Sequence, residues 1–192
     1  MRRLLCIATL TFGVVHGATA QEMGQQAQVA SSLDNVSSPA SQDAAASDAT
    51  ARTHQVSRMI SQKFGVAKAK AEQISAAVMS AASKYSLPPA LLLAIISIES
   101  RFKENARGLN GATGLMQVVP AAHRKLVRNI DLTEAEANIE AGSAILHGYV
   151  QSARGDVGAA LKSYGGSTAY AEKVSLQVKK FTPQTAPVTS GD

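Results

Sequence analysis

The stretch Pro89-Ala-Leu-Leu-Leu-Ala-Ile-Ile-Ser-Ile98 decides the fold, because it would be apolar on nearly every side of a helix. A helix that is hydrophobic all round is buried, and proline suits its first turn. Glu99 follows at once and shares a face with the isoleucines one turn earlier. A carboxyl against such a wall loses hydration, which raises its pKa and suits it to general-acid chemistry. The same pattern also fits a glutamate that ends the helix and points to solvent or pairs with the basic residues after it.

Helical spacing also dominates the rest of the chain beyond residue 65. Residues 103–119 contain three glycines and predict a loop, with room for a small hairpin. No alternating strand pattern is present. We therefore expect an all-α domain, or an α domain with a minimal β hairpin, around a central buried helix. The expected helices are 66–85, 89–102, 120–127, 138–153, 157–164 and 167–181.

The first twenty residues have the pattern of a cleavable signal peptide. Arg2 and Arg3 precede a short apolar run, and Ala18-Thr19-Ala20 is a small-x-small cleavage signal. The run Leu4–Val15 is well short of the roughly 20 residues that span a bilayer. We expect a periplasmic or secreted protein of a bacterial envelope, with no integral membrane segment after cleavage.

Composition divides the remaining chain into three parts. Residues 21–53 are rich in Gln, Ala, Ser and Asp and predict a disordered linker. Residues 54–182 predict one domain, and residues 183–192 a disordered tail. From Arg52 onward there are 17 basic and 10 acidic residues. That excess favours an anionic partner, or indicates only a solvated basic surface, and export argues against nucleic acid.

Several kinds of chemistry are excluded by the residue types. Cys6 is the only cysteine and lies in the expected signal peptide, so the mature chain has no thiol nucleophile. The histidines are scattered, and neither a His-Glu-x-x-His nor a Gly-x-Ser-x-Gly motif occurs. We therefore expect no metal site and no cofactor.

The glycine-rich loop has features of a binding segment. Gly108, Gly111 and Gly114 would let the backbone approach a bound chain closely. Gln117 offers an amide that can both donate and accept hydrogen bonds to sugar groups. Glycine loops are commonly just turns, so this loop alone does not identify a site.

A series of motifs resembles the soluble lytic transglycosylases, whose catalytic domain is lysozyme-like. The resemblance covers roughly residues 70 to 178, with the elements in family order. The motifs are Glu99-Ser100, Gly114-Leu115-Met116-Gln117, Asn138-Ile139 with Gly142, Tyr164, and Tyr170 to Val174.

The resemblance implies cleavage of the MurNAc-β-1,4-GlcNAc bond of peptidoglycan, with formation of 1,6-anhydro-MurNAc. Glu99 would be the single acid and base, assisted by the substrate's acetamido group. Met116, Gln117 and Tyr164 would bind substrate. Tyr170 would flank a sugar ring, or be an ordinary core tyrosine. Ser100 is also counted among the substrate-binding residues. We expect it to end the helix and not to act as a catalyst.

Two departures from the family pattern stand out. The family often has serine where this chain has Gly108, and usually asparagine where it has Gly165. They put efficiency and subsite preference in question more than the class of reaction.

Alternative functions stay open. These are a hydrolytic muramidase, and a non-catalytic peptidoglycan-binding or assembly protein on the same fold. A nucleic-acid module is remote. Expected partners are peptidoglycan glycan strands, a secretion or envelope machine stays open as a further partner, and we expect a monomer.

Overall fold

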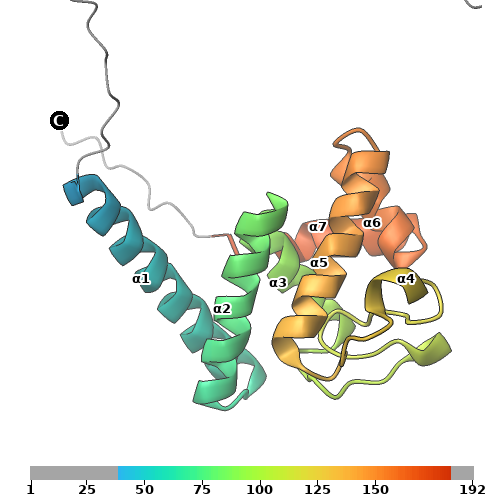
Figure 1. The fold of residues 1–192 in the computed structure, drawn as a ribbon, viewed down its shortest axis with the longest axis horizontal. Coiled ribbons are helices and arrows are strands. Elements are labelled where there is room, and N and C mark those ends of the chain that lie inside the picture. The colour runs from blue at the N-terminus through green and yellow to red at the C-terminus, as the bar shows by residue number, and fades with distance from the viewer. Residues whose placement is uncertain (1–38, 183–192) are drawn as a thin grey trace, which may run out of the picture. The chain divides into compact units, whose positions relative to one another are not determined.

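The computed structural model describes residues 39–182, and all structural statements below concern that part of the chain. Within it no extended strand forms, and isolated antiparallel bridges join Thr113 to Arg107 and to Val118. The prediction of an all-α domain with at most a small hairpin is therefore confirmed (Figure 1). The elements are α1 (Pro39–Phe64), α2 (Lys68–Tyr85), α3 (Pro89–Glu99), a 3-10 turn η1 (Leu109–Gly111), α4 (Arg124–Val127), α5 (Ala135–Ser152), α6 (Val157–Gly165) and α7 (Thr168–Val178).

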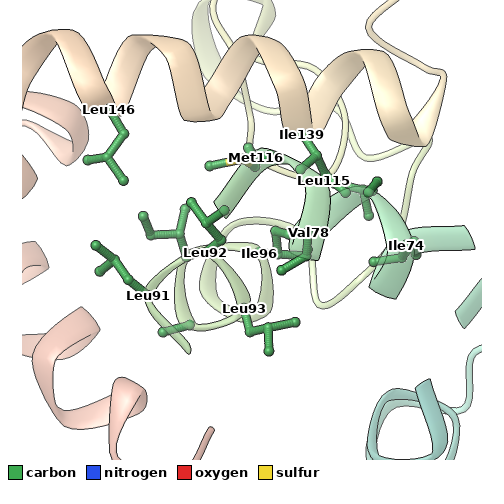
Figure 2. Packing of buried hydrophobic residues seen from close by; sticks show 14 of the residues in the cluster. Ile74, Val78, Leu91, Leu92, Leu93, Ile96, Leu115, Met116, Ile139 and Leu146 are labelled. Atoms are coloured by element: carbon green, nitrogen blue, oxygen red, sulfur yellow. The ribbon is translucent and has the colours of Figure 1, made fainter. Parts of the chain in front are cut away.

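Helix α3 is the central element, as its all-round apolar sequence predicts. Every residue from Leu91 to Ser97 is buried. Figure 2 shows its leucines and Ile96 beside side chains from α2, the glycine-rich loop and α5. The helix ends at Glu99 rather than near Phe102 as predicted, because the next turn has left-handed backbone at both central residues. Glu99 therefore lies at the rim of the core.

Helix α1 corrects the prediction of a disordered linker. Residues 39–53 of that linker are helical, whereas residues 1–38 and 183–192, which include the expected signal peptide and tail, lie outside the described residues. The segment lacks large apolar residues, but it is rich in alanine, which has the highest helix propensity. It continues directly into the second half of α1, which packs on the core. The helix can therefore extend into this segment without a separate, costly nucleation step.

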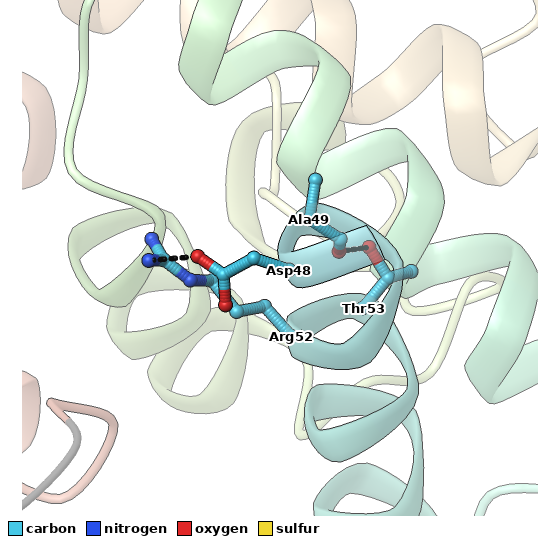
Figure 3. Close-up of polar contacts among 4 residues, drawn as sticks. All are labelled: Asp48, Ala49, Arg52 and Thr53. Carbon is cyan, nitrogen blue, oxygen red and sulfur yellow. Dashed lines mark hydrogen bonds and ion pairs between the residues drawn. The ribbon is translucent and has the colours of Figure 1, made fainter. Parts of the chain in front are cut away.

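Local side-chain bonds support this exposed half of α1. Arg52 pairs with Asp48 one turn earlier, and the Thr53 hydroxyl donates to the Ala49 carbonyl over 2.9 Å (Figure 3). An ion pair at this spacing stabilises an isolated helix by about 0.2–0.5 kcal/mol, whereas the threonine bond to the backbone satisfies the hydroxyl without such a gain. Helix α1 packs along α2. No helix between residues 39 and 182 is both long and apolar enough to cross a membrane.

The last two helices begin at side-chain caps. The Asp156 carboxylate accepts a bond from the Ala159 amide over 3.0 Å, and the Ser167 hydroxyl accepts one from the Tyr170 amide over 3.1 Å. These are the expected roles of Asp and Ser at helix N-termini. Gly166 closes α6 in the left-handed conformation. The sharp α6–α7 junction that results fixes where α7 starts.

Asn138 of α5 joins the helical layer to the glycine-rich loop. Its side chain is fully buried. Its amide nitrogen donates to the carbonyls of Thr113 and Leu132, each over 2.8 Å, and its oxygen accepts from the Met116 amide over 2.8 Å. Gly114 passes so close that a Cβ there would lie 2.1 Å from the Asn138 amide nitrogen. One buried amide thus holds both ends of the Thr113–Met116 segment.

We predict that Asn138→Ala lowers the free energy of unfolding by about 2–4 kcal/mol, because it leaves the buried Met116 amide and Leu132 carbonyl without partners, while the Thr113 carbonyl keeps its bond from the Val118 amide. Urea denaturation followed by circular dichroism measures this change. Asn129→Ala, at an exposed asparagine, is the matched control and should change stability by no more than about 0.5 kcal/mol. Equal effects of the two substitutions would contradict an anchoring role for Asn138.

Candidate functional site

The Glu99 carboxyl is half-buried at the end of α3. Burial raises its pKa, while the Tyr170 hydroxyl and the positive charge of Lys173 act in the opposite direction. Burial is the largest cause, so the pKa stays above its ordinary value. The direction of this shift is the one expected from the apolar run that precedes Glu99.

Helix α7 brings Tyr170 and Lys173 to Glu99. It packs against α3, and the Gln177 amide donates to the Ser97 hydroxyl over 3.0 Å. Tyr170 and Lys173 are three residues apart and therefore lie on one face of the helix. The contact between α3 and α7 thus places both the Tyr170 hydroxyl and the positive charge of Lys173 near Glu99.

Tyr170 lies over the α6–α7 junction. A Cβ at Gly165 would be 2.1 Å from its ring atoms, so the ring occupies the space that any larger residue would need. The Tyr170 hydroxyl is buried and makes no hydrogen bond of ordinary geometry. Burial raises its pKa, and so do the charge of Glu99 and a weak interaction with that carboxyl. Glu99 is therefore a neighbour of the Tyr170 hydroxyl, close enough for its charge to act on it.

Tyr164 of α6 approaches Glu99 from a second direction. Its hydroxyl donates to the Met116 carbonyl over 2.9 Å. Burial raises its pKa, followed by the charges of Glu99 and Tyr149. Because that hydroxyl proton is committed to the loop backbone, Tyr164 stays neutral and fixes the loop relative to the acid.

Gln117 turns back onto its own loop. Its side-chain nitrogen donates to the carbonyls of Ala106 and Gly114, over 3.2 and 3.0 Å. A Cβ at Gly108 would lie 2.2 Å from the Gln117 side-chain oxygen. A serine at position 108 would therefore displace this side chain, and both amide donors of Gln117 are already occupied.

The side chain of Met116, one of the expected substrate-binding residues, faces the core. It is fully buried, and Figure 2 shows it among the core side chains. A Cβ at Gly142 would come within 2.7 Å of it, so the glycine in α5 makes room for the methionine. Its apolar side chain gains more from the core than from solvent. The part of Met116 that reaches the site is the carbonyl held by Tyr164.

Ser100 ends α3 and opens a strained turn. Its buried hydroxyl donates to the Ile96 carbonyl over 3.1 Å, so it caps the helix rather than facing a cleft. The Lys103 amide then donates to the Ser100 carbonyl across Arg101 and Phe102, whose φ values are +53° and +63°. Left-handed backbone costs an ordinary L-residue about 1–2 kcal/mol. The chain thus leaves Glu99 through a turn that its own residues disfavour.

Other carboxylates are paired away from Glu99. Glu104 bonds to Lys70 over 2.8 Å. Glu140 pairs with Lys84 and accepts from the Tyr85 hydroxyl over 2.6 Å. Partial burial acts to raise the Glu140 pKa, but these bonds outweigh it and lower the pKa. Both acids therefore tie parts of the fold together.

A cavity of about 40 Å³ lies beside Tyr164, between α5 and the loop. Gln117, His123 and Tyr149 also line it, and the Tyr149 ring meets the rings of Tyr164 and His123 at centroid distances of 6.4 Å. A larger hollow of about 670 Å³, between α6 and α7, contains none of the predicted site residues.

Sequence reasoning missed Lys173, Tyr149 and His123 as neighbours of the site. The spacing of Lys173 from Tyr170 could have indicated the first, since both lie on one helical face. No local pattern brings Tyr149 and His123 together, because they come from α5 and the turn before α4. Among residues 39–182, no group of three or more His, Asp or Glu side chains is placed to hold a metal ion.

We predict that Glu99→Gln raises the melting temperature at pH 7. The folded-state pKa of Glu99 is raised, so its ionisation costs stability as pH rises above the unfolded pKa of about 4.3. The glutamine does not ionise, so the gain should vanish below about pH 4. Differential scanning calorimetry at several pH values measures it. Glu172→Gln, on an exposed α7 residue, is the control and should show no such trend. A gain that is independent of pH would contradict the buried-carboxyl interpretation.

The family model described as "Transglycosylase SLT domain" matches residues 76–186, which is more than half of the chain and includes every predicted site residue. Among solved structures, an inactive mutant of the lytic transglycosylase Slt from Pseudomonas aeruginosa is similar, with 26% sequence identity and a TM-score of 0.45. That match covers 51% of this chain and 17% of the Slt chain, so this chain corresponds to less than a fifth of Slt. The chain belongs to the transglycosylase SLT domain family.

Proposed function

We propose that this chain is a peptidoglycan lytic transglycosylase in which Glu99 is the single acid and base. It would cleave the MurNAc-β-1,4-GlcNAc bond and leave a 1,6-anhydro-MurNAc end. The observation that carries the proposal is the half-buried Glu99 carboxyl, whose pKa is raised by burial beside two tyrosines. Membership of the transglycosylase SLT domain family supports the substrate class.

The raised pKa supports the first chemical step. A protonated Glu99 donates its proton to the glycosidic oxygen as the bond from MurNAc C1 to that oxygen breaks. The leaving GlcNAc then carries a neutral hydroxyl. The acetamido oxygen of the same MurNAc attacks C1, which replaces the carboxylate nucleophile of two-acid glycosidases. Glu104 and Glu140 are bonded elsewhere, so they do not compete for that role.

The second step returns the proton to Glu99. The ionised carboxylate accepts a proton from the MurNAc C6 hydroxyl, and the C6 oxygen forms a bond to C1 as the acetamido oxygen leaves. The acid is thereby restored without water. Lys173 favours the ionised carboxylate that exists between the two steps, because an opposite charge nearby stabilises it.

We assign supporting roles to the remaining predicted residues. Tyr164 and the Met116 carbonyl that it holds form the wall between Glu99 and the glycine-rich loop. Tyr170 limits the positions open to the carboxyl by packing beside it, with its buried hydroxyl as a neighbour. Gln117 offers its side-chain oxygen to sugar groups, since its donors are used within the loop. Ser100 acts only through the helix end.

The same proposal sets the place of action and the partner. Peptidoglycan lies in the bacterial envelope, so we propose a periplasmic or secreted protein, in agreement with the signal-like residues 1–20. The excess of basic residues suits the anionic peptide stems of that polymer.

We predict that residues 21–192 release anhydro-muropeptides from purified sacculi and that Glu99→Gln lowers the rate at least about 100-fold. Mass spectrometry distinguishes anhydro ends from reducing ends. Reducing ends alone would replace the proposal with a hydrolytic muramidase. Sacculus binding without turnover by either protein would favour a non-catalytic binding role. The melting temperature of the variant shows that the loss is not one of folding.

Gly165→Ala tests the proposed role of Tyr170. Gly165 does not have positive φ, so the backbone tolerates alanine and the only conflict is with the Tyr170 ring. We expect the ring to move and the rate to fall about tenfold or more, because small displacements at a reacting centre are costly. Gly148→Ala is the control, since a Cβ there meets no atom within 4 Å. Unchanged turnover in Gly165→Ala would contradict a role for Tyr170 in the site.

A further inference from the structure

The strained turn after Glu99 is enclosed by aromatic rings. Phe102 is only 3% exposed. Its ring centroid lies 4.5 Å from that of Phe64 and 6.4 Å from that of Phe181. Both separations are typical of attractive aromatic pairs, and the tilted geometry suits them. Through Phe102 and Phe64, the turn after α3 therefore packs against the end of α1.

The rings are placed to maintain the strained backbone. Arg101 and Phe102 both have positive φ, and neither is glycine or asparagine. Such backbone persists only where the surroundings over-determine it. The Arg101 side chain is exposed, whereas the Phe102 side chain is held on two sides. Phe102 is therefore the residue through which the fold imposes this conformation.

Phe64 comes from outside the family-matched segment. It is the last residue of α1, and the match begins at residue 76. Ile60, one turn earlier, is fully buried, and Val56 packs on the same core. Helix α1 is thus firmly seated where it presents Phe64 to Phe102.

We propose that Phe64 is a positioning residue for Glu99, holding the Phe102 ring and with it the turn that fixes the carboxyl toward Tyr170. In this role α1 is part of the enzyme rather than a spacer before it. The inference rests on the proposed function, because it explains how an acid at a helix end is kept in one orientation.

The first test compares two truncations on α1. Phe64→Ala removes the ring that contacts Phe102, and Val56→Ala removes apolar contact about 12 Å away along the same helix. We expect kcat on sacculi to fall about tenfold in Phe64→Ala, with KM within twofold of wild type. Val56→Ala should keep the wild-type kcat when both are assayed below their melting temperatures. Equal losses in the two variants would overturn the proposal.

The second test relieves the strain directly. Asparagine tolerates left-handed backbone better than arginine does, so Arg101→Asn should make the turn less dependent on the clamp. Added to Phe64→Ala, Arg101→Asn should restore at least half of the lost kcat. Arg101→Ala removes the same side chain without favouring positive φ, so it should restore nothing. Rescue by both substitutions, or by neither, would contradict the proposed link through backbone strain.

Two readouts separate positioning from general weakening. A loosened turn hydrates Glu99, so the alkaline limb of the kcat–pH profile should move to lower pH in Phe64→Ala. The groups facing Glu99 are Tyr164 from α6 and Tyr170 and Lys173 from α7, and all three are unchanged in this variant. Hydrogen exchange of residues 100–106 should rise in Phe64→Ala but not in Val56→Ala. An unmoved pH limb together with unchanged exchange would overturn the inference.

The two proposals can fail separately. If wild-type protein releases no muropeptide product, the proposed function fails, while the exchange comparison still tests the clamp. If wild type is active and Phe64→Ala matches it in kcat and exchange, the clamp fails and the enzymatic function stands.

Discussion

The loss of hydration at one carboxyl is the constraint on which the site depends. Glu99 ends a helix in which every residue from Leu91 to Ser97 is buried, so its carboxyl lies half-buried at the rim of the core. The surrounding residues act on the charge of that carboxyl in opposite directions. The apolar wall favours the protonated acid, and Lys173 with Tyr170 favours the carboxylate. In the proposed mechanism Glu99 both gives and takes a proton, and such a group needs this balance, because a pKa far from the working pH would slow one of the two steps.

The two departures from the family pattern have a common physical meaning. At both positions a glycine leaves space that a predicted site residue fills. The Gln117 side chain occupies the space beside Gly108, and the Tyr170 ring occupies the space beside Gly165. A serine or asparagine at these positions would need a different arrangement of those neighbours. At each of these two positions glycine therefore allows a close approach that a larger side chain would prevent.

The sequence predicted most of the helices and the partly buried setting of Glu99, because those depend on local patterns. The apolar run before Glu99 predicts a buried helix. The prolines at the start of α3 and the glycines at the end of α6 mark where those helices begin and end. The rest depended on tertiary contacts. Helix α1 extends through residues with no apolar face, supported by propensity and by the packed half that follows. The Met116 side chain faces the core because Gly142, from a different helix, makes room for it. Tyr149 and His123 meet only after folding.

The strained turn shows why the acid and the fold cannot be separated. A relaxed turn after α3 would let the helix end fray, and a frayed end would expose Glu99 to water and lower its pKa. Keeping the carboxyl dry therefore requires that the chain change direction at once after Ser100, even through residues that disfavour left-handed backbone. The cost is local and amounts to about 1–2 kcal/mol per residue. It is offset by burying Phe102 among rings from α1 and the chain's last described turn. Packing of Phe102 against Phe64 and Phe181 thus supports a backbone conformation that the residues after Glu99 would not adopt alone.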